Sequence, residues 1–338
     1  MKAKTVDSSL IASIYFSKGR DADIIDAVAK RISDTPSCRL VNVHPNSYYD
    51  RTNILFCGPS KKVVAASLNI AEEVFSRVRL SERDEELSAL GSLDLVSFLP
   101  FCAAEMDHAK KAAEEFSNKL LAKRTLPIFL FGESARNRER RDFRVFRQFH
   151  HLNLPELLNE EEWQPDLGSV DFDPEVGVAV VGARLFHLNF AIYFDTEDIE
   201  LIDELSKVHE RLDAEENGEM HGNWTFEEIS RLLKQVNTFV DDRPDKKVVR
   251  MLCNVPDYTR TRLTDLVEVF SNEAALLGIE TVGSKILGHL PCEALIECES
   301  SVPIDELKIG SQVEALRLNA IEPFNMKRQI LDFYVNRR

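Results

Sequence analysis

Apolar residues along the chain follow two patterns that alternate with each other. Short apolar runs bounded by turn residues predict β-strands, and apolar residues spaced by three or four positions predict one-sided helices. In the first half, the predicted strands are 10–16, 40–43, 53–57, 93–98 and 127–131. The predicted helices between these strands are 21–31, 60–78 and 106–120.

The alternation resumes after a long connection, 150–174, which is rich in Pro and acidic residues and carries Trp163. The predicted strands of the second half are 176–181, 188–194 and 248–253, followed by extended segments at 279–282 and 286–290. Helices are predicted to include 201–212 and 263–277, and polar loops are predicted at 214–223 and 241–247.

Strands that alternate with helices predict an α/β fold in which helices cover sheets. The pattern breaks near 175–185, and each half is too short for a complete doubly wound domain. Two smaller α/β subdomains of the ferredoxin-like type fit these lengths better. No convincing sequence repeat relates the two halves.

The charge balance argues against some classes of binding partner. Lys and Arg total 42 against 57 Asp and Glu, which gives a net charge of −15. This argues against non-specific binding of nucleic acid and against an anionic membrane surface. An anionic ligand would therefore need a local basic site.

The six cysteines form no CxxC pair, so we expect no zinc site and read them as free thiols in a reducing compartment. No signal-type stretch and no apolar run of about 20 residues occurs, so we expect a cytoplasmic protein without a membrane span. The common phosphate-loop, dinucleotide, hydrolase and metalloprotease motifs do not occur either.

Six arginines gather after the predicted strand 127–131, and they are Arg136, Arg138, Arg140, Arg141, Arg144 and Arg147. Guanidinium groups bind carboxylates, so this run could receive an acidic ligand. For the later arginines we favour a solvated helix face, because surface charge runs are usually solvated. Arg136 differs because it closely follows a strand and the turn Gly132–Glu133.

Two further features could carry chemistry. The glycines of the segment 168–184 allow the backbone to approach either a ligand or another strand, and the sequence favours neither alternative. His44 follows a predicted strand, at a place where α/β sites often form, although a lone histidine there is more often structural than catalytic.

Several short strings in order along the chain resemble the glutamate formiminotransferase module of formiminotransferase–cyclodeaminase. They are Asp50-Arg51-Thr52, Phe56-Cys57-Gly58-Pro59, Gly91-Ser92-Leu93-Asp94, Phe98-Leu99-Pro100, Gly132-Glu133-Ser134-Ala135-Arg136, Trp163-Gln164-Pro165-Asp166, Gly182-Ala183-Arg184, Asn254-Val255-Pro256-Asp257-Tyr258 with Thr261, and Val282-Gly283-Ser284 with Gly288 and Pro291. The resemblance covers about 10–334 and does not include the all-helical cyclodeaminase module.

This resemblance implies two α/β subdomains, an N-terminal type at 8–182 and a C-terminal type at 183–334, whose sheets face each other across a folate-binding tunnel. It also implies transfer of a formimino group from formiminoglutamate to N5 of tetrahydrofolate, without a metal. Family precedent suggests a homodimer.

The chain departs from the family at the position of the general base. Anchored on Gly91–Asp94, the family's His-x-Gly-x-His-Pro-Arg string places the base on Leu87, its partner histidine on Arg83 and its arginine on Ala89, and only Glu86 is kept. A leucine side chain has no proton to exchange, and loss of a general base costs about 10²–10⁴-fold in rate.

Other family positions point to ligand binding. His44 matches a family site aspartate, so it is a candidate replacement base. The family's folate segment matches Gly168, Ser169, Val170, Asp171, Phe172, Asp173, Pro174, Glu175, Val176 and Gly177, and it is followed by an intact Arg184. The acidic residues of this segment disfavour a polyglutamate tail, and Arg136 is the candidate contact for a ligand carboxylate.

Three hypotheses remain open at this point. The leading one is a formiminotransferase-like, folate-binding protein of one-carbon metabolism whose transferase activity is reduced or lost. The second is an active folate-dependent transferase that uses His44 or another base. The third is a non-catalytic interaction protein that has kept the fold.

Overall fold

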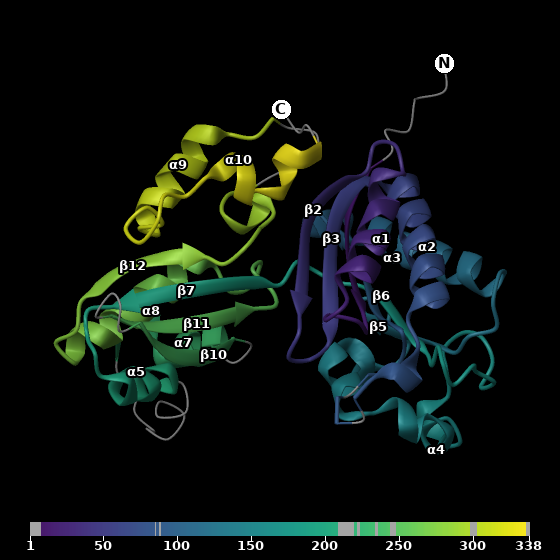
Figure 1. Ribbon diagram of the computed structural model, residues 1–338. Coiled ribbons are helices and arrows are strands. Elements are labelled where there is room, and N and C mark those ends of the chain that lie inside the picture. The colour runs from purple at the N-terminus through teal and green to yellow at the C-terminus, as the bar shows by residue number, and fades with distance from the viewer. Residues whose placement is uncertain are drawn as a thin grey trace. The chain divides into compact units, whose positions relative to one another are not determined.

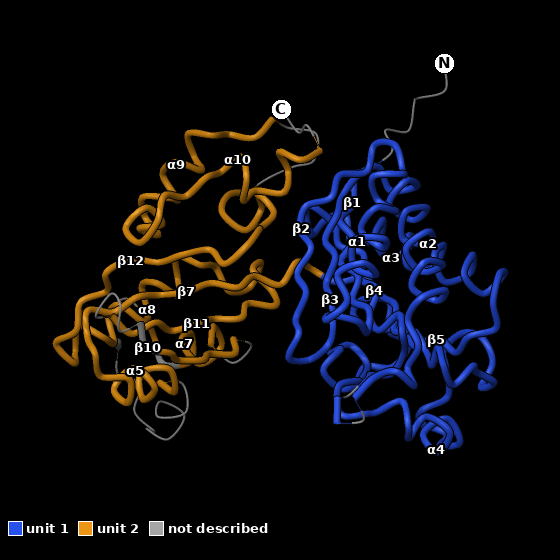
Figure 2. Tube along the Cα trace, in the orientation of Figure 1, with its two compact units in different colours: residues 1–184 blue, residues 185–338 orange. Residues whose placement is uncertain are grey.

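The computed structural model describes residues 8–84, 86–87, 89–208, 220–221, 224–233, 236–243, 248–297 and 303–335. The chain divides into two compact units, residues 1–184 and residues 185–338 (Figure 2). Each unit has its own sheet and its own hydrophobic core, so each is described by itself.

The first unit begins with a ferredoxin-like arrangement (Figure 1). Its elements are β1 (Ser9–Phe16), α1 (Ala22–Ser33), β2 (Arg39–Asn46), β3 (Arg51–Pro59), α2 (Ser60–Arg77), the 3-10 turn η1 (Leu80–Glu82) and β4 (Leu93–Pro100). These four strands lie in the order β2-β3-β1-β4, and all three pairings are antiparallel. This is the strand order of the ferredoxin-like βαββαβ motif.

Two parallel strands extend this sheet to six, giving the order β2-β3-β1-β4-β6-β5. The added strands are β5 (Ile128–Gly132) and β6 (Ala179–Ala183). The turn η2 (Ala103–Glu105) and the helix α3 (Met106–Leu121) lie between β4 and β5 in the sequence. The outer side of β5 is already occupied, because Ile128 and Leu167 exchange two backbone hydrogen bonds of 2.9 and 3.1 Å. At the opposite edge, the pairing of β2 with β3 shifts register between Leu40 and Asn42.

Side-chain alternation explains which face of the sheet is covered by helices. In β1, the even-numbered residues from Leu10 to Phe16 are fully buried against the three long helices of this unit. The odd-numbered residues, among them Ser13 and Tyr15, point to the opposite face. The helices likewise bury one face, as α1 does. Asp21 caps α1 by accepting a hydrogen bond from the backbone N–H of Ile24 at 3.0 Å.

A layer of short turns covers half of the opposite face. It consists of η3 (Arg138–Arg141), η4 (Phe143–Gln148), η5 (His151–Asn153), α4 (Leu154–Leu157) and η6 (Glu161–Trp163). Its aromatic side chains pack on β5 and β6, and the ring centroids of Phe129 and Trp163 are 6.3 Å apart.

The arginines of this layer correct the prediction of a solvated helix face. Arg140 is buried, its Nη1 donates to Asp166 Oδ2 at 2.9 Å, and its guanidinium lies 5.1 Å from the centre of the Phe129 ring. Arg147 reaches a second buried carboxylate, that of Asp94. The segment forms 3-10 turns rather than one helix, so successive arginines point in different directions, and only some of them, such as Arg144, face solvent.

The second unit repeats the ferredoxin-like strand order. Its elements are β7 (Leu188–Phe194), α5 (Ile199–Ser206), β8 (Met220–His221), β9 (Trp224–Thr225), α7 (Phe226–Leu233), β10 (Asn237–Arg243), β11 (Val248–Val255), α8 (Leu263–Leu276), β12 (Thr281–Ile286), η7 (Cys292–Ala294), α9 (Glu306–Ala315), α10 (Met326–Gln329) and η8 (Leu331–Val335). The sheet order β10-β11-β7-β12 is antiparallel throughout.

The prediction of a mixed α/β fold in ferredoxin-like subdomains is confirmed. The sequence patterns did not predict α7, α9 or β10. The strand β10 includes part of the predicted loop 241–247. Most of the predicted loop 214–223 lies outside the described residues. Among the helices that are described, none is long and apolar enough to cross a membrane.

The Arg140–Asp166 ion pair gives a test of the short-turn layer. We expect Arg140→Met to lower the free energy of unfolding by about 3 kcal/mol, because it leaves the Asp166 carboxylate buried without its cation. The measurement is urea unfolding at neutral pH. The matched control is Arg144→Met, which changes an exposed arginine and should cost less than about 1 kcal/mol. Equal losses in the two variants would contradict this role of Arg140.

Candidate ligand-binding site

The half of the sheet face outside the short-turn layer carries polar side chains, of which Ser13 and Ser97 are buried, Tyr15 and Asn53 half-buried and His44 exposed. Register places His44 of β2 opposite Asn53 of β3, which in turn lies opposite Tyr15 of β1. Directly opposed residues point to the same side of a sheet, so these three side chains form one row across the strands. Ser13 and Ser97 are likewise opposed in the adjacent row. We call this set of five residues, together with Arg184, the polar sheet face.

Hydrogen bonds connect members of the polar sheet face. Asn53 Nδ2 donates to Ser13 Oγ at 2.8 Å, and Arg184 Nε donates to Ser97 Oγ at 3.3 Å. Burial lowers the pKa of Arg184 to about 10, and the nearby Tyr15 partly opposes this shift. Arg184 therefore remains a cation at neutral pH and gives this face a positive charge.

A buried carboxylate lies beside the polar sheet face. Asp94 of β4 is 3% exposed and accepts a hydrogen bond from Arg147 Nη1 at 2.5 Å. Arg51 Nε lies 3.1 Å from the same carboxylate oxygen. Burial alone would raise the pKa of Asp94, but Arg147 and Arg51 together hold it below its usual value. Arg147 also lies 6.0 Å from the centre of the Tyr15 ring, so the cluster adjoins the polar sheet face.

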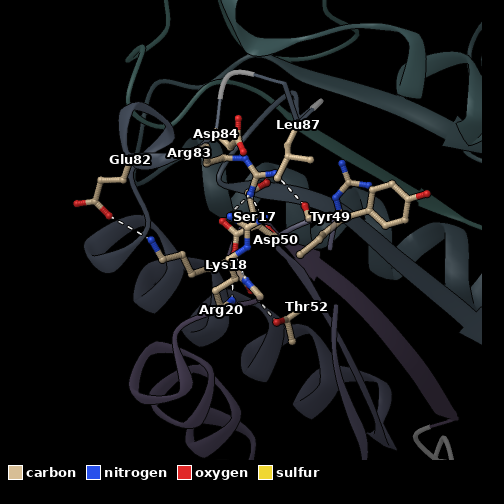
Figure 3. Close-up of polar contacts among 12 residues, drawn as sticks. Ser17, Lys18, Arg20, Tyr49, Asp50, Thr52, Glu82, Arg83, Asp84 and Leu87 are labelled. Atoms are coloured by element: carbon tan, nitrogen blue, oxygen red, sulfur yellow. Dashed lines mark hydrogen bonds and ion pairs between the residues drawn. The ribbon is translucent and has the colours of Figure 1, made fainter. Parts of the chain in front are cut away.

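The loop between η1 and β4 is tied to the β2–β3 turn by Arg83 (Figure 3). The Arg83 side chain is fully buried, and its Nη1 and Nη2 donate to the carbonyls of Asp50 and Tyr49 at 2.6 and 3.2 Å. The Asp50 carboxylate accepts from the backbone N–H groups of Gly19 and Arg20 at 2.7 and 3.0 Å. At the position that the resemblance assigns to a family histidine, this chain therefore has a structural arginine.

Leu87, at the family's base position, is half-buried and is held through its backbone. Its carbonyl lies 3.1 Å from His150 Nε2, while His150 Nδ1 accepts the backbone N–H of Leu152 at 3.2 Å. Because an N–H can only donate, Nδ1 carries the lone pair and Nε2 carries the proton. Both nitrogens of His150 are thus engaged in holding loops, which argues against His150 as a free base.

The predicted folate segment, 168–177, runs beside the loop that carries Leu87. The backbone N–H groups of Leu80 and Ser92 donate to the carbonyls of Glu175 and Val176 at 3.1 and 2.8 Å. A Cβ added at Gly177, where φ is +71°, would lie 2.2 Å from the Leu90 carbonyl oxygen. Close approach to another backbone therefore explains this glycine, and the folate contacts of the segment stay a prediction.

The remaining predicted site residues do not lie together. His44 is exposed on β2, whereas Arg136 is exposed in the turn after β5, and these strands form opposite edges of the sheet. Five strand spacings separate the edges, or about 24 Å. Arg136 Nη1 donates to the Asp166 carbonyl at 2.6 Å. Of these two predicted residues, only His44 belongs to the polar sheet face.

Sequence reasoning did not assign Tyr15, Ser97, Asp94 or Arg147 to the site. Two features of the sequence point to some of them. Tyr15 is a polar residue within the apolar strand 10–16, and Asp94 and its partner Arg51 belong to the strings that resemble the family. In the part of the chain that the structure describes, no group of three or more His, Cys, Asp or Glu side chains is placed to hold a metal ion.

Comparison with known families shows which proteins this chain resembles in sequence. Residues 9–184 match the formiminotransferase domain, N-terminal subdomain, and residues 212–336 match the formiminotransferase domain. The chain belongs to the formiminotransferase family. The matched ranges fall in the first and second units respectively.

The relatives differ in how much of their own length this chain covers. Formimidoyltransferase-cyclodeaminase from Sus scrofa is 30% identical over 329 residues, which is 95% of this chain and 58% of that protein. Glutamate formimidoyltransferase from Streptococcus pyogenes serotype M1 is 22% identical over 88% of this chain and 94% of its own length. Among solved structures, the periplasmic protease PqqL from Escherichia coli covers 94% of this chain and 36% of its own, with 8% identity and a TM-score of 0.18, which is too low to support an argument.

The low pKa of Asp94 predicts a loss of stability in acid. Its carboxylate contributes stability above the unfolded pKa of about 3.9, and this contribution is lost as the pH falls through the folded pKa. We expect Asp94→Asn to lower the free energy of unfolding by about 3 kcal/mol at pH 7, with a difference from wild type that shrinks below about pH 4.

Urea unfolding at several pH values between about 3 and 7 measures this difference. Asp107→Asn, which changes an exposed carboxylate at the start of α3, is the control and should show no comparable pH-dependent loss. A constant difference between Asp94→Asn and wild type at every pH would contradict the assignment.

Proposed function

We propose that this chain is a folate-binding protein of one-carbon metabolism whose glutamate formimidoyltransferase activity is reduced or lost. Family membership over both units supports the ligand class. Two residues carry the loss of activity: Leu87 presents no titratable group, and Arg83 is committed to backbone carbonyls.

The polar sheet face supports a ligand that combines a flat polar ring system with a negative charge. Asn53 and Arg184 are half-buried and offer an amide and a cation, whereas Ser13 and Ser97 are buried and hold these two side chains through hydrogen bonds. The exposed carboxylates of Asp171 and Asp173 favour a monoglutamyl folate over a polyglutamyl one, because like charges repel. A cytoplasmic location and a homodimer are parts of the same proposal, by family precedent.

An active enzyme is the second candidate, and one observation favours it. His44 lies in the same row as Asn53 and Tyr15, so its imidazole is on the polar sheet face. A base on that face could accept a proton from a ligand held there, within a hydrogen-bonding distance of about 3 Å.

Calorimetry with folinic acid tests the binding. We expect measurable heat and a thermal stabilisation that rises with ligand concentration, because a ligand that binds only the folded state stabilises it. The absence of both effects up to millimolar ligand would reject the proposal.

A coupled assay for formimino-tetrahydrofolate should then show little turnover by wild type. Leu87→His should raise the rate by at least about tenfold, and Leu87→Gln, which is polar but not basic, should not.

The role of His44 is tested in the same assay. If the wild-type chain turns over substrate with His44 as its base, His44→Ala should lower the rate by about 10²–10⁴-fold without a comparable loss of folinic acid binding. His108→Ala is the matched control, because His108 lies on α3 and belongs to the helix-covered side. Equal rates for wild type and His44→Ala would remove His44 from the reaction.

A further inference from the structure

The second unit has a pocket of its own beside α8, with a volume of about 560 Å³. This volume lies within the range of small-molecule sites. One part of its wall is the face of α8 formed by Val267, Ser271 and Ala275, which are spaced by four positions along the helix. The start of β12 and the residues 315–317 at the end of α9 complete the wall. None of these elements contributes to the polar sheet face.

Thr281, the first residue of β12, brings a buried hydroxyl group to this pocket. Register places Thr281 opposite Phe194 of β7, which belongs to the same core cluster as Phe270 of α8, so the Thr281 side chain is on the α8 side of the sheet. Thr281 is 7% exposed, and its Oγ1 has no hydrogen-bond partner in the described part of the chain. Because a buried hydroxyl without a partner is costly, a hydrogen bond to a ligand here would be favourable.

Arg317 is held at the pocket in an uncommon backbone conformation. It follows the C-cap of α9 and has a φ of +49°, in the left-handed region where glycine is favoured. Its Nη1 donates to the Thr281 carbonyl at 2.7 Å, which is the one hydrogen bond of its side chain among the described residues. A guanidinium has four further N–H groups. A non-glycine residue in this region often marks a functional position.

Glu280 brings the opposite charge to the same pocket. Its side chain is exposed, and its carboxylate makes no hydrogen bond or ion pair with any residue that the structure describes. Because Arg317 bonds to the carbonyl of the next residue, Thr281, the two charges lie within the length of a small molecule. The C-terminal ends of α8 and α9 also line the pocket, and helix C-termini carry partial negative charge that favours a cation.

We propose that this pocket binds a free apolar α-amino acid, which is a zwitterion at neutral pH. Its carboxylate accepts hydrogen bonds from Arg317 and from the Thr281 hydroxyl, and its ammonium group lies against Glu280 and the helix C-termini. Its side chain packs on the apolar part of the wall, formed by Val267, Ile279 and Leu316. An acidic side chain is disfavoured because Glu280 repels it. This inference is independent of the proposed function, and either can fail without the other.

Calorimetry on the full chain with L-leucine and two truncated analogues tests the site. The analogue 4-methylpentanoate lacks the ammonium group of leucine, and 3-methylbutylamine lacks its carboxylate. Wild type should bind leucine at least about tenfold more tightly than either analogue, because each lost group had a charged partner. L-Glutamate should likewise bind at least about tenfold more weakly. No heat up to millimolar leucine, or equal affinities for leucine and both analogues, would overturn the inference.

Two variants assign the charged groups. Arg317→Gln should lower leucine affinity to that of 3-methylbutylamine, because the ligand carboxylate has lost its cation. Glu280→Gln should lower it to that of 4-methylpentanoate, because the ammonium group has lost its carboxylate. The matched controls are Arg328→Gln and Glu306→Gln, which change exposed charges of the same unit outside the pocket and should keep both preferences.

Thr281→Val is the third variant, and it keeps the test decisive if Arg317→Gln does not fold. Valine has a shape similar to threonine, and the lost hydroxyl bonds to no described residue, so the free energy of unfolding should not fall. Leucine affinity should fall by about tenfold, as expected for a hydrogen bond to a charged group. Wild-type affinity and preferences in every folded variant of the three would show that leucine binds elsewhere, and would overturn the inference.

Discussion

The buried carboxylate of Asp94 joins three parts of the first unit that are far apart in the sequence. It belongs to β4, one of its partners begins β3, and the other comes from the turn η4 of the layer on the opposite face. A carboxylate removed from water is costly unless it is paired, so the positions of Arg51 and Arg147 are strongly constrained. The Arg147 pair also holds the turn η4 against the sheet beside Tyr15.

Much of the fold could be predicted because strand and helix periods are local. Residues 10–16 and 127–131 show apolar runs that correspond closely to β1 and β5. The strand β10 could not be predicted in this way, because 237–243 ends in Asp-Asp-Arg and its Phe239 is exposed. Backbone pairing with β11 holds this strand, and such pairing leaves little trace in composition.

The candidate site was less predictable because its contacts join distant residues. Leu87 was found from the resembling strings, but the hydrogen bond of its carbonyl with His150 spans 63 positions. Arg147 and Asp94 are 53 positions apart, and Arg140 and Asp166 are 26 apart. A run of arginines is usually solvated, and only knowledge of the partner carboxylates distinguishes the buried members from the exposed ones.

The two edges of the six-stranded sheet are both unsuited to adding another strand. On β2, the register shift after Leu40 distorts the ladder, and Pro45 has no backbone N–H to donate. On β5, Ile128 already bonds to Leu167, and the N–H of Leu130 donates to Asp166 Oδ2 at 2.8 Å. Intermolecular β-augmentation is therefore disfavoured at this sheet, and self-association through the first unit must rely on side-chain surfaces instead of a continuous backbone ladder.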